Sequence, residues 1–349
     1  MKPPFRADQV GSLLRAPGLA EARRRKDLPF QRKAIREAVA RQEAIGLQGV
    51  TDGEFSRDWW HLDFLAQLDG VALKANPGPK FAGTEEQPPI PVVTGKLGYS
   101  RPVMIEDFVF LNSCTSRTAK FTIPSPSMLH LRAGRAGIAY DDMEEFWSDA
   151  AAAYRAAIAA FAAAGCTYLQ LDDVAFAYLC DPKIRENCRR NGDDPERLPR
   201  IYANTINRAL EARPRGMTIT MHTCRGNFKS AWVAEGGYEP VAEAMFSCAV
   251  DGFFMELDSA RAGGFEPLRL LPSGRKAVLG LVTSKSAELE SKEHLKRRIG
   301  EAAKFVALED LCLSPQCGFS STHHGNRLTE EEQWRKLERV IEVAKEVWQ

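Results

Sequence analysis

The sequence predicts an α/β fold of the (β/α)8 TIM-barrel class, because three features agree. Short runs rich in β-forming residues alternate along the chain with longer segments of helical periodicity. These runs number eight, which is the number of parallel strands that closes such a barrel. No shift in composition marks a second domain, so we expect residues 1–349 to form a single barrel domain.

The elements follow one another in a regular order. The candidate strands lie at 6–12, 46–54, 120–126, 168–173, 218–224, 252–258, 276–282 and 311–317. Helical periodicity covers most intervals between them, at 32–46, 142–164, 196–212, 238–247, 292–307 and 329–348. The exception is residues 70–118, a β-rich excursion between the second and third strands that is Pro/Gly-rich and then extended in character over 102–112. We expect this excursion to form a hairpin over the mouth of the barrel.

Composition and charge exclude several classes of protein. Lys+Arg 47 against Asp+Glu 46 gives a net charge of +1, so no overall field favours nucleic acid or an anionic membrane. The N-terminus lacks an apolar signal region, and no segment approaches the roughly 18 apolar residues that span a bilayer. The eight cysteines show no disulfide-framework spacing. We therefore expect a cytoplasmic protein with reduced thiols.

Four metal-binding side chains stand at predicted strand ends, where barrels of this class carry their chemistry. His222 and Cys224 are two residues apart, so they share one face of the fifth strand. Glu256 ends the sixth strand, and Cys317 ends the eighth, across the mouth. One imidazole, two thiolates and a carboxylate form a tetrahedral Zn²⁺ set in which an incoming ligand can replace the carboxylate.

Each of these residues also has an ordinary structural explanation. A single His-x-Cys pair is weak evidence of a metal site, and Cys317 alone is more often a small buried apolar side chain. Glu256 alone could be an ion-paired carboxylate of the barrel. Packing explains less well why all of them stand at strand ends, so the zinc site is the favoured interpretation.

The chain resembles the cobalamin-independent methionine synthase family, specifically its C-terminal catalytic barrel and its short single-barrel relatives. The likeness rests on "VGS", "DGEFSR", "LQLDD", "HTC", "MELD" and "SPQCG", in that order along the chain. The resemblance implies that Glu54 and Asp172 bind the amino group of a thiol such as homocysteine. It also implies that Ser12 contacts the carboxylate of that thiol.

Several positions depart from the pattern of that family. The full-length enzymes carry a second barrel that helps to hold polyglutamyl folate, and this chain is too short for it. The tryptophan that stacks on the pterin falls near Leu129 or His130, and the histidine proton donor is replaced by Lys285. We therefore expect a smaller or differently shaped methyl donor, or a methyl-carrying partner protein.

The sequence as a whole predicts zinc-dependent methyl transfer to a thiol such as homocysteine, giving methionine or a related thioether through a zinc-bound thiolate. Coordination to Zn²⁺ removes the proton of a thiol that is mostly un-ionised at neutral pH. A departing amine must gain a proton, which Lys285, His323 or His324 could supply. Trp59, Trp60, His61 and Phe64 follow the second strand, where their side chains can form an aromatic wall for a flat or hydrophobic donor. Core packing is favoured for one of the tryptophans and a place in the pocket for the other.

Two other functions remain open. The same zinc could serve alkyl transfer to a different thiol from a non-folate donor, such as an epoxide, methylcobalamin or a methylated small molecule. The chain could also be a non-catalytic zinc-binding barrel, but Glu54 and Asp172 argue against that, because a passive metal site has no need of amine-binding carboxylates. Relatives with the uroporphyrinogen decarboxylase fold share the barrel, but their chemistry needs no such cysteine and histidine set.

Overall fold

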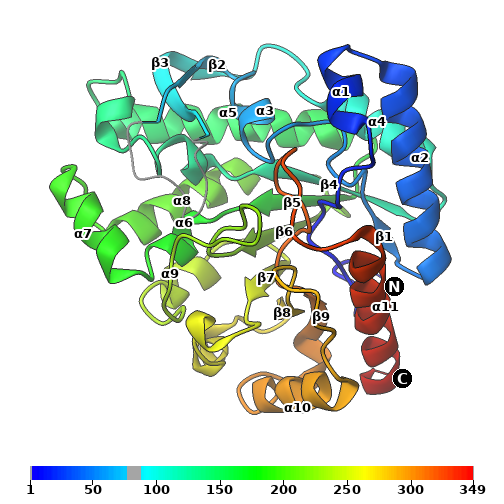
Figure 1. The fold of residues 1–349 in the computed structure, drawn as a ribbon. Helices are drawn as coiled ribbons and strands as arrows, with labels where there is room; N and C mark the ends of the chain where they lie inside the picture. The colour runs from blue at the N-terminus through cyan, green and yellow to red at the C-terminus, as the bar shows by residue number, and fades with distance from the viewer. Residues whose placement is uncertain (1, 77–87, 349) are drawn as a thin grey trace.

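The computed structural model describes residues 2–76 and 88–348, and in it a curved parallel sheet is surrounded by helices (Figure 1). Within these residues seven parallel strands pair in the order β1-β4-β5-β6-β7-β8-β9. Their bounds are β1 (Gly49–Val50), β4 (Thr118–Pro124), β5 (Tyr168–Asp172), β6 (Thr218–Thr223), β7 (Gly252–Glu256), β8 (Lys276–Val282) and β9 (Leu311–Pro315). The predicted TIM-barrel class is confirmed.

The N-terminal segment lies between the two outer strands of this sheet. Only Ala7 forms a bridge, which is parallel to Leu313 of β9, and the Asp8 N–H donates to the Leu313 carbonyl at 3.0 Å. On the other side the Thr51 hydroxyl donates to the Gly11 carbonyl at 2.6 Å. The predicted strand at 6–12 therefore occupies its expected place in the barrel but is not a regular strand.

A buried ion pair fixes that segment to the barrel interior. Lys120 of β4 places its Nζ 3.2 Å from Asp8 Oδ1, and the Tyr168 hydroxyl of β5 donates to Asp8 Oδ2 at 2.8 Å. All three side chains are buried. Because a buried charge is tolerated only when it is paired and hydrogen-bonded, these contacts explain a lysine inside a core strand.

The helices form the outer layer. They are α1 (Leu19–Arg24), α2 (Leu28–Ile45), α3 (Leu62–Leu65), α4 (Ile105–Ser113), α5 (Met143–Ala163), α6 (Ala175–Tyr178), α7 (Pro182–Arg190), α8 (Leu198–Leu210), α9 (Ala242–Phe246), α10 (Lys292–Ala302) and α11 (Glu330–Val347). Caps set several of the starts: Asp142 accepts from the Glu144 N–H at α5, and Thr329 and Glu332 form a capping box at α11. Within the described residues no helix is both long and apolar enough to cross a membrane.

The excursion at 70–118 contains the expected hairpin, formed by antiparallel β2 (Asp69–Lys74) and β3 (Ile90–Gly98). The hairpin packs beside the start of α5, where the Ala139 N–H donates to the Val93 carbonyl at 2.8 Å. Residues 77–87, which belong to the predicted excursion, lie outside the described residues.

The predicted extended run at 102–112 is wrong, because these residues contain α4 (Ile105–Ser113). Phe108 and Leu111, three residues apart, are buried, whereas Val109 between them is 49% exposed. Helical spacing of the apolar residues outweighs the β-forming character of Val109 and its neighbours. The predicted helix at 238–247 is likewise shortened to α9, because Pro240 disfavours helical backbone at the residue before it.

Candidate metal centre and substrate cavity

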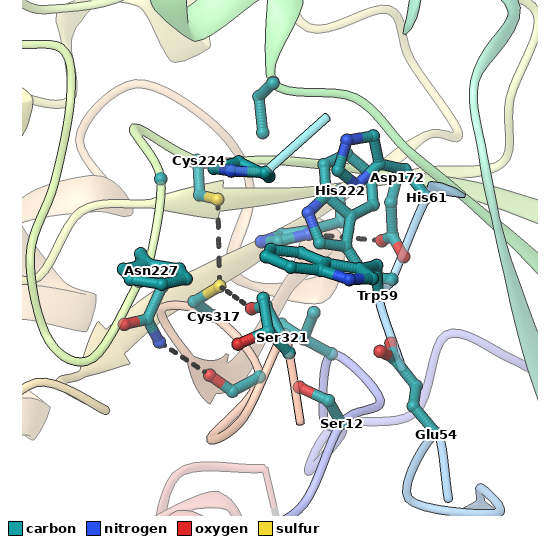
Figure 2. Close-up of a pocket in the computed structure, with 18 of the residues that line it drawn as sticks. Ser12, Glu54, Trp59, His61, Asp172, His222, Cys224, Asn227, Cys317 and Ser321 are labelled. Atoms are coloured by element: carbon teal, nitrogen blue, oxygen red, sulfur yellow. Dashed lines mark hydrogen bonds and ion pairs between the residues drawn. The ribbon is translucent and has the colours of Figure 1, made fainter. Parts of the chain in front are cut away.

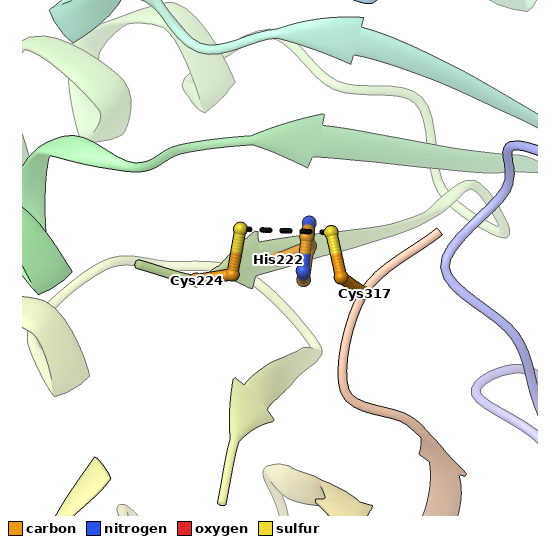
Figure 3. A group of neighbouring side chains, drawn as sticks. All are labelled: His222, Cys224 and Cys317. Atoms are coloured by element: carbon orange, nitrogen blue, oxygen red, sulfur yellow. Dashed lines mark hydrogen bonds between the residues drawn. The ribbon is translucent and has the colours of Figure 1, made fainter. Parts of the chain in front are cut away.

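Three side chains at the ends of β6 and β9 form a compact cluster of metal-ligand atoms. One ligand atom each from His222, Cys224 and Cys317 lies within 4.8 Å of the others, and all three residues are buried (Figure 3). The two sulfur atoms are 3.7 Å apart. Tetrahedral Zn²⁺ with Zn–S bonds of about 2.3 Å separates two thiolates by about 3.8 Å, so the pair has the spacing that zinc requires. We refer to these residues as the three-ligand cluster.

The local fold explains why the cluster forms. Alternation along β6 turns His222 and Cys224 to the same side, and Gly226, with a φ of 94°, follows in the connecting segment. The ring of His222 is oriented by Asp172 at the end of the neighbouring strand, with Nδ1 3.2 Å from Asp172 Oδ1. A carboxylate that receives one imidazole N–H leaves the other nitrogen for a metal, as in many carboxylate–histidine–zinc arrangements.

Hydrogen bonds within the cluster and to Asp172 shift the pKa values of its members. Burial lowers the pKa of His222, but hydrogen bonds to Asp172 and Cys317 outweigh it and raise the pKa to about 10. A hydrogen bond from Cys224, with the nearby His222, holds the pKa of Cys317 well below its usual range. An imidazolium beside a thiolate is a pair that a divalent cation replaces with loss of protons. The donor set therefore fits zinc.

Glu256, the predicted fourth ligand, lies outside the three-ligand cluster. It is fully buried at the end of β7, where Oε2 accepts from the Arg225 N–H and Oε1 accepts from the Arg261 guanidinium, each at 2.5 Å. Burial raises the pKa of this carboxyl, but Lys285 and Arg225 lower it below its ordinary value overall. To bind the same ion, Glu256 would have to leave Arg261, so its role as a labile ligand stays a prediction.

The three predicted proton donors do not line the cavity beside the cluster. Lys285 Nζ lies 3.9 Å from Glu256 Oε1 and has no hydrogen-bond partner among the described residues. The rings of His323 and His324 lie 3.9 Å apart and pack edge-on against Trp59, at 5.6 and 5.2 Å. Their role as acids stays a prediction without support from the cavity lining.

The cavity itself opens directly over the cluster and encloses about 620 Å³, including the space at its entrance (Figure 2). It is lined by Val10, Ser12, Glu54, Trp59, Trp60, His61, Pro88, Arg132, Asp172, Val174, Tyr178, His222, Cys224, Gly226, Asn227, Phe228, Cys317, Gly318, Ser321 and Thr322. The predicted substrate-binding residues Ser12, Glu54, Asp172, Trp59 and Trp60 are all among them. The fold therefore brings the residues predicted to bind acceptor and donor into one cavity with the three-ligand cluster.

Glu54 carries a buried carboxylate oxygen that no described residue hydrogen-bonds. Oε1 accepts from the Thr122 hydroxyl at 3.2 Å, whereas the buried Oε2 has no hydrogen-bond partner among the described residues. Burial, aided by the charge of Asp172, raises the pKa of Glu54 to about 7 despite the nearby Arg57. Its backbone has a φ of 61°, which is uncommon for a residue with a side chain and is often found at functional sites.

Ser12 is held by the loop that follows Cys317. Its Oγ accepts from the Ser320 N–H at 3.2 Å. A Cβ on Gly318 would lie 2.0 Å from that Oγ, so only glycine permits this approach. The loop thereby joins the cysteine ligand to the predicted carboxylate-binding residue.

The opposite side of the cavity is aromatic. The rings of Trp59 and Phe228 are nearly parallel, at 9°, with centroids 6.2 Å apart, and Trp60 lies 4.4 Å from His61. We call Trp59, Trp60 and Phe228 the aromatic wall. Both tryptophans line the cavity, and Trp60 also packs against the hydrophobic core. Phe64 is fully buried against Tyr154.

Sequence reasoning did not assign several residues that line the cavity, chief among them Arg132, Tyr178, Asn227 and Phe228, whereas His61 was expected in the aromatic wall. Asn227 and Phe228 follow the His-x-Cys run by only three and four residues, so their place after a strand end was an available signal. Arg132 and Tyr178 offer no such signal, because Arg132 comes from the loop after β4 and Tyr178 from the end of α6, after β5. The segment at Leu129 and His130 contributes no ring to the cavity.

Three comparisons with known proteins agree with this geometry. Residues 14–346 match the family model described as cobalamin-independent synthase, catalytic domain. The chain is 49% identical over 361 residues to the uncharacterized protein YxjH of Bacillus subtilis (strain 168), covering 99% of this chain and 96% of that one. It is also similar to the crystal structure of a candidate vitamin-B12-independent methionine synthase from Listeria monocytogenes, with a TM-score of 0.80, 39% identity and coverage of 100% and 99%.

A more distant relative shows how the lengths compare. The 5-methyltetrahydropteroyltriglutamate–homocysteine methyltransferase of Bifidobacterium animalis subsp. lactis is 24% identical over 318 residues, which are 90% of this chain but 38% of that protein. The match thus covers one part of a larger enzyme and nearly the whole of the short relatives. Because the family model matches residues 14–346, this chain belongs to the family of cobalamin-independent synthase catalytic domains.

Proposed function

We propose that this chain is a zinc-dependent thiol S-methyltransferase whose acceptor is homocysteine or a closely related amino-acid thiol. One observation carries the proposal: the three-ligand cluster lines one cavity with Glu54, whose Oε2 has no hydrogen-bond partner in the described part of the chain. A metal site alone would bind many thiols. A buried carboxylate beside it selects those that also carry an ammonium group.

His222, Cys224 and Cys317 would hold the zinc ion, with Asp172 fixing the orientation of the imidazole. Bound zinc lowers the pKa of a coordinated thiol while leaving its sulfur nucleophilic. Two cysteine ligands make the centre electron-rich, which favours sulfur nucleophilicity over Lewis acidity. A substrate that fills the cavity would displace water from the cluster, which strengthens the electrostatic contacts between the protein and its substrate.

The acceptor would lie between the cluster and the buried end of the cavity. Glu54, with Asp172 near it, binds the ammonium group, and Ser12 binds the carboxylate. Each charge-assisted hydrogen bond of this kind contributes about 1.5–3 kcal/mol. These contacts fix the acceptor at two points, so its thiol can reach only the metal end of the cavity.

The donor would lie against the aromatic wall, which suits a flat or apolar group. We infer a donor smaller than polyglutamyl folate or one delivered by a methyl-carrying partner protein. A non-catalytic zinc store is disfavoured, because it would gain nothing from a buried carboxylate with an unpaired oxygen, which destabilises the fold.

An acceptor-by-donor activity matrix tests the proposal. Apo and zinc-loaded protein would be assayed with homocysteine and with 4-mercaptobutanoate, its amine-free analogue, against methyl iodide, methylcobalamin and methylfolates. We expect zinc-dependent methylation of homocysteine, with the amine-free thiol at least tenfold poorer in kcat/KM. Turnover that is equal for apo and loaded protein would contradict the proposal.

A further inference from the structure

His61 is a buried histidine in the cavity that the chemistry described so far does not use. It lies between β1 and α3, and its residue is only 2% exposed. Its ring contacts the indole of Trp60, with centroids 4.4 Å apart, and the residue lines the cavity together with Trp59 and Asp172 (Figure 2). It therefore stands where the aromatic wall meets the acceptor-binding end.

Neither ring nitrogen of His61 has a hydrogen-bond partner among residues 2–76 and 88–348. A neutral imidazole has one N–H to donate and one lone pair to accept, and buried groups of this kind are normally bonded. The contrast with His130 is direct: that ring is equally buried but has the Tyr202 hydroxyl at 2.9 Å and Asp193 at 3.2 Å. The nitrogens of His61 are thus available to a ligand in the cavity.

The charge around His61 supports the same view. Burial, together with the positive charge of Arg132, lowers the pKa of His61 well below its usual range, so the free protein holds a neutral ring. Arg132 also lines the cavity on this side, and the buried carboxylates Glu54 and Asp172 lie at the acceptor end. A donor that is already cationic departs as a neutral group without a proton, so a relayed proton serves only a donor whose nitrogen is uncharged.

The other candidate proton carriers lie outside the cavity lining or within the three-ligand cluster. Lys285, His323 and His324 do not line the cavity, and His222 belongs to the three-ligand cluster. Within the described lining, His61 is the histidine that combines a free donor with a free acceptor. An imidazole can take a proton on one nitrogen and release one from the other, which suits it to relay rather than store protons.

We propose that His61 is a catalytic residue that relays a proton to the departing nitrogen of an uncharged N-methyl donor seated against the aromatic wall. The proposal rests on the proposed methyl transfer. In the step, the S–CH₃ bond forms, the N–CH₃ bond breaks, and the electron pair of that bond stays on the nitrogen. The proton that the acceptor thiol gives up ends on the same nitrogen, so the sum is R–SH + CH₃–NR₂ → R–S–CH₃ + H–NR₂.

Two donors that differ in their need for a proton test this role. Methyl iodide releases iodide, which needs no proton, whereas 5-methyltetrahydrofolate monoglutamate releases an amine that does. In zinc-loaded His61→Phe we expect kcat/KM for the methylfolate to fall about 100-fold or more, in the range of general acid–base catalysis. With methyl iodide the rate should stay within about threefold of wild type, because nothing in that reaction uses the relay.

Two further variants separate the relay from a structural role. His61→Gln keeps a hydrogen-bonding amide but cannot relay a proton, so it should show the same selective loss with the methylfolate. Tyr154→Phe is the matched control, since it removes a buried hydroxyl that has no partner among the described residues and does not line the cavity. It should leave both donors unaffected. Zinc content would be measured for every variant by elemental analysis. Donor affinity would be measured by tryptophan fluorescence.

The outcomes separate this inference from the proposed function. Equal losses with both donors in His61→Phe and His61→Gln, or no loss with either, would overturn the relay and leave the zinc–thiol chemistry standing. Wild-type protein that uses methyl iodide but no N-methyl donor would also overturn it. Failure of wild type with methyl iodide and homocysteine would instead remove the proposed function, and the relay with it.

Discussion

The two sides of the cavity are built in different ways. The three-ligand cluster stands on the ends of β6 and β9, and its histidine is fixed by Asp172 on the adjacent strand. The aromatic wall stands on two connecting segments, 55–61 and 225–233, the second of which contains Lys229 and Ser230 in left-handed backbone conformation. The metal side is thus positioned by the sheet, and the donor side by loops.

This difference assigns different tasks to the two sides. Ligand distances to a metal tolerate little error, and a sheet provides that accuracy. Loops vary more readily and commonly set which substrate is accepted. We infer that the metal side determines the reaction and that the aromatic wall, with His61, determines the methyl donor. The following predictions test that division.

The largest effect should come from the metal side. Cys317→Ala removes one of three ligands, so we expect zinc content to fall well below one ion per chain and thiol methylation to fall by about 10³-fold or more. The control is Cys312→Ala on the same strand, because Cys312 is equally buried but lies outside the cluster. Elemental analysis and methyl iodide turnover would be measured together, and full zinc with full turnover in Cys317→Ala would refute the ligand assignment.

The next effect concerns the acceptor. Glu54→Gln keeps the shape of the side chain but loses the charge that pairs with an ammonium group. We expect KM for homocysteine to rise about tenfold or more while zinc content stays unchanged. The amine-free 4-mercaptobutanoate serves as control, since its KM should hardly change. An equal rise for both thiols would show that Glu54 has a different role.

The ionised Glu54 carboxylate should also lower the free energy of unfolding above neutral pH. Its pKa is about 7 in the folded protein, against an ordinary value of 4.5. The folded protein therefore binds more protons than the unfolded chain across this interval, and the contribution to stability is lost as pH rises from 4.5 to 7. We expect Glu54→Gln to be about 1–3 kcal/mol more stable than wild type at pH 8 and nearly equal to it at pH 4.5. Urea unfolding at the two pH values measures this. A stability difference between Glu54→Gln and wild type that is the same at pH 4.5 and pH 8 would contradict the raised pKa of Glu54.

The smallest effect should come from a single loop residue. Trp59→Leu removes one ring of the aromatic wall, so KM for the methyl donor should rise about three- to tenfold. The acceptor KM and the zinc content should stay at wild-type values. Trp232→Leu offers a matched control, because Trp232 is 44% exposed and does not line the cavity. A loss of zinc in Trp59→Leu would show that the aromatic wall and the three-ligand cluster do not have independent roles.

The same division explains how much could be predicted from the sequence. Strands β5 to β9 match the predicted runs to within two residues at either end, because buried parallel strands have a strong local pattern. His222, Cys224 and Cys317 follow from those strands, since each stands where its strand ends. Helix α4 was mistaken for an extended segment because its pattern is short and rich in β-forming residues.

Contacts between distant segments could not be predicted. Arg261 binds Glu256 from a short 3₁₀ helix after β7 (Ala260–Ala262), and neither partner indicates the other in the sequence. Arg132 and Phe228 reach the cavity from separate loops, and only the folded chain brings them together. His61 was visible within the aromatic run after β1, but its two unpaired nitrogens are a property of the packed structure.

The most direct test of the account is X-ray absorption at the zinc edge before and after addition of homocysteine. Zinc-loaded protein should show two sulfur ligands at about 2.3 Å and a nitrogen ligand at about 2.0–2.1 Å. Addition of homocysteine should raise the sulfur count to three, with the same metal content. A site with fewer than two sulfur ligands, or a sulfur count that homocysteine leaves unchanged, would contradict thiol activation at the three-ligand cluster.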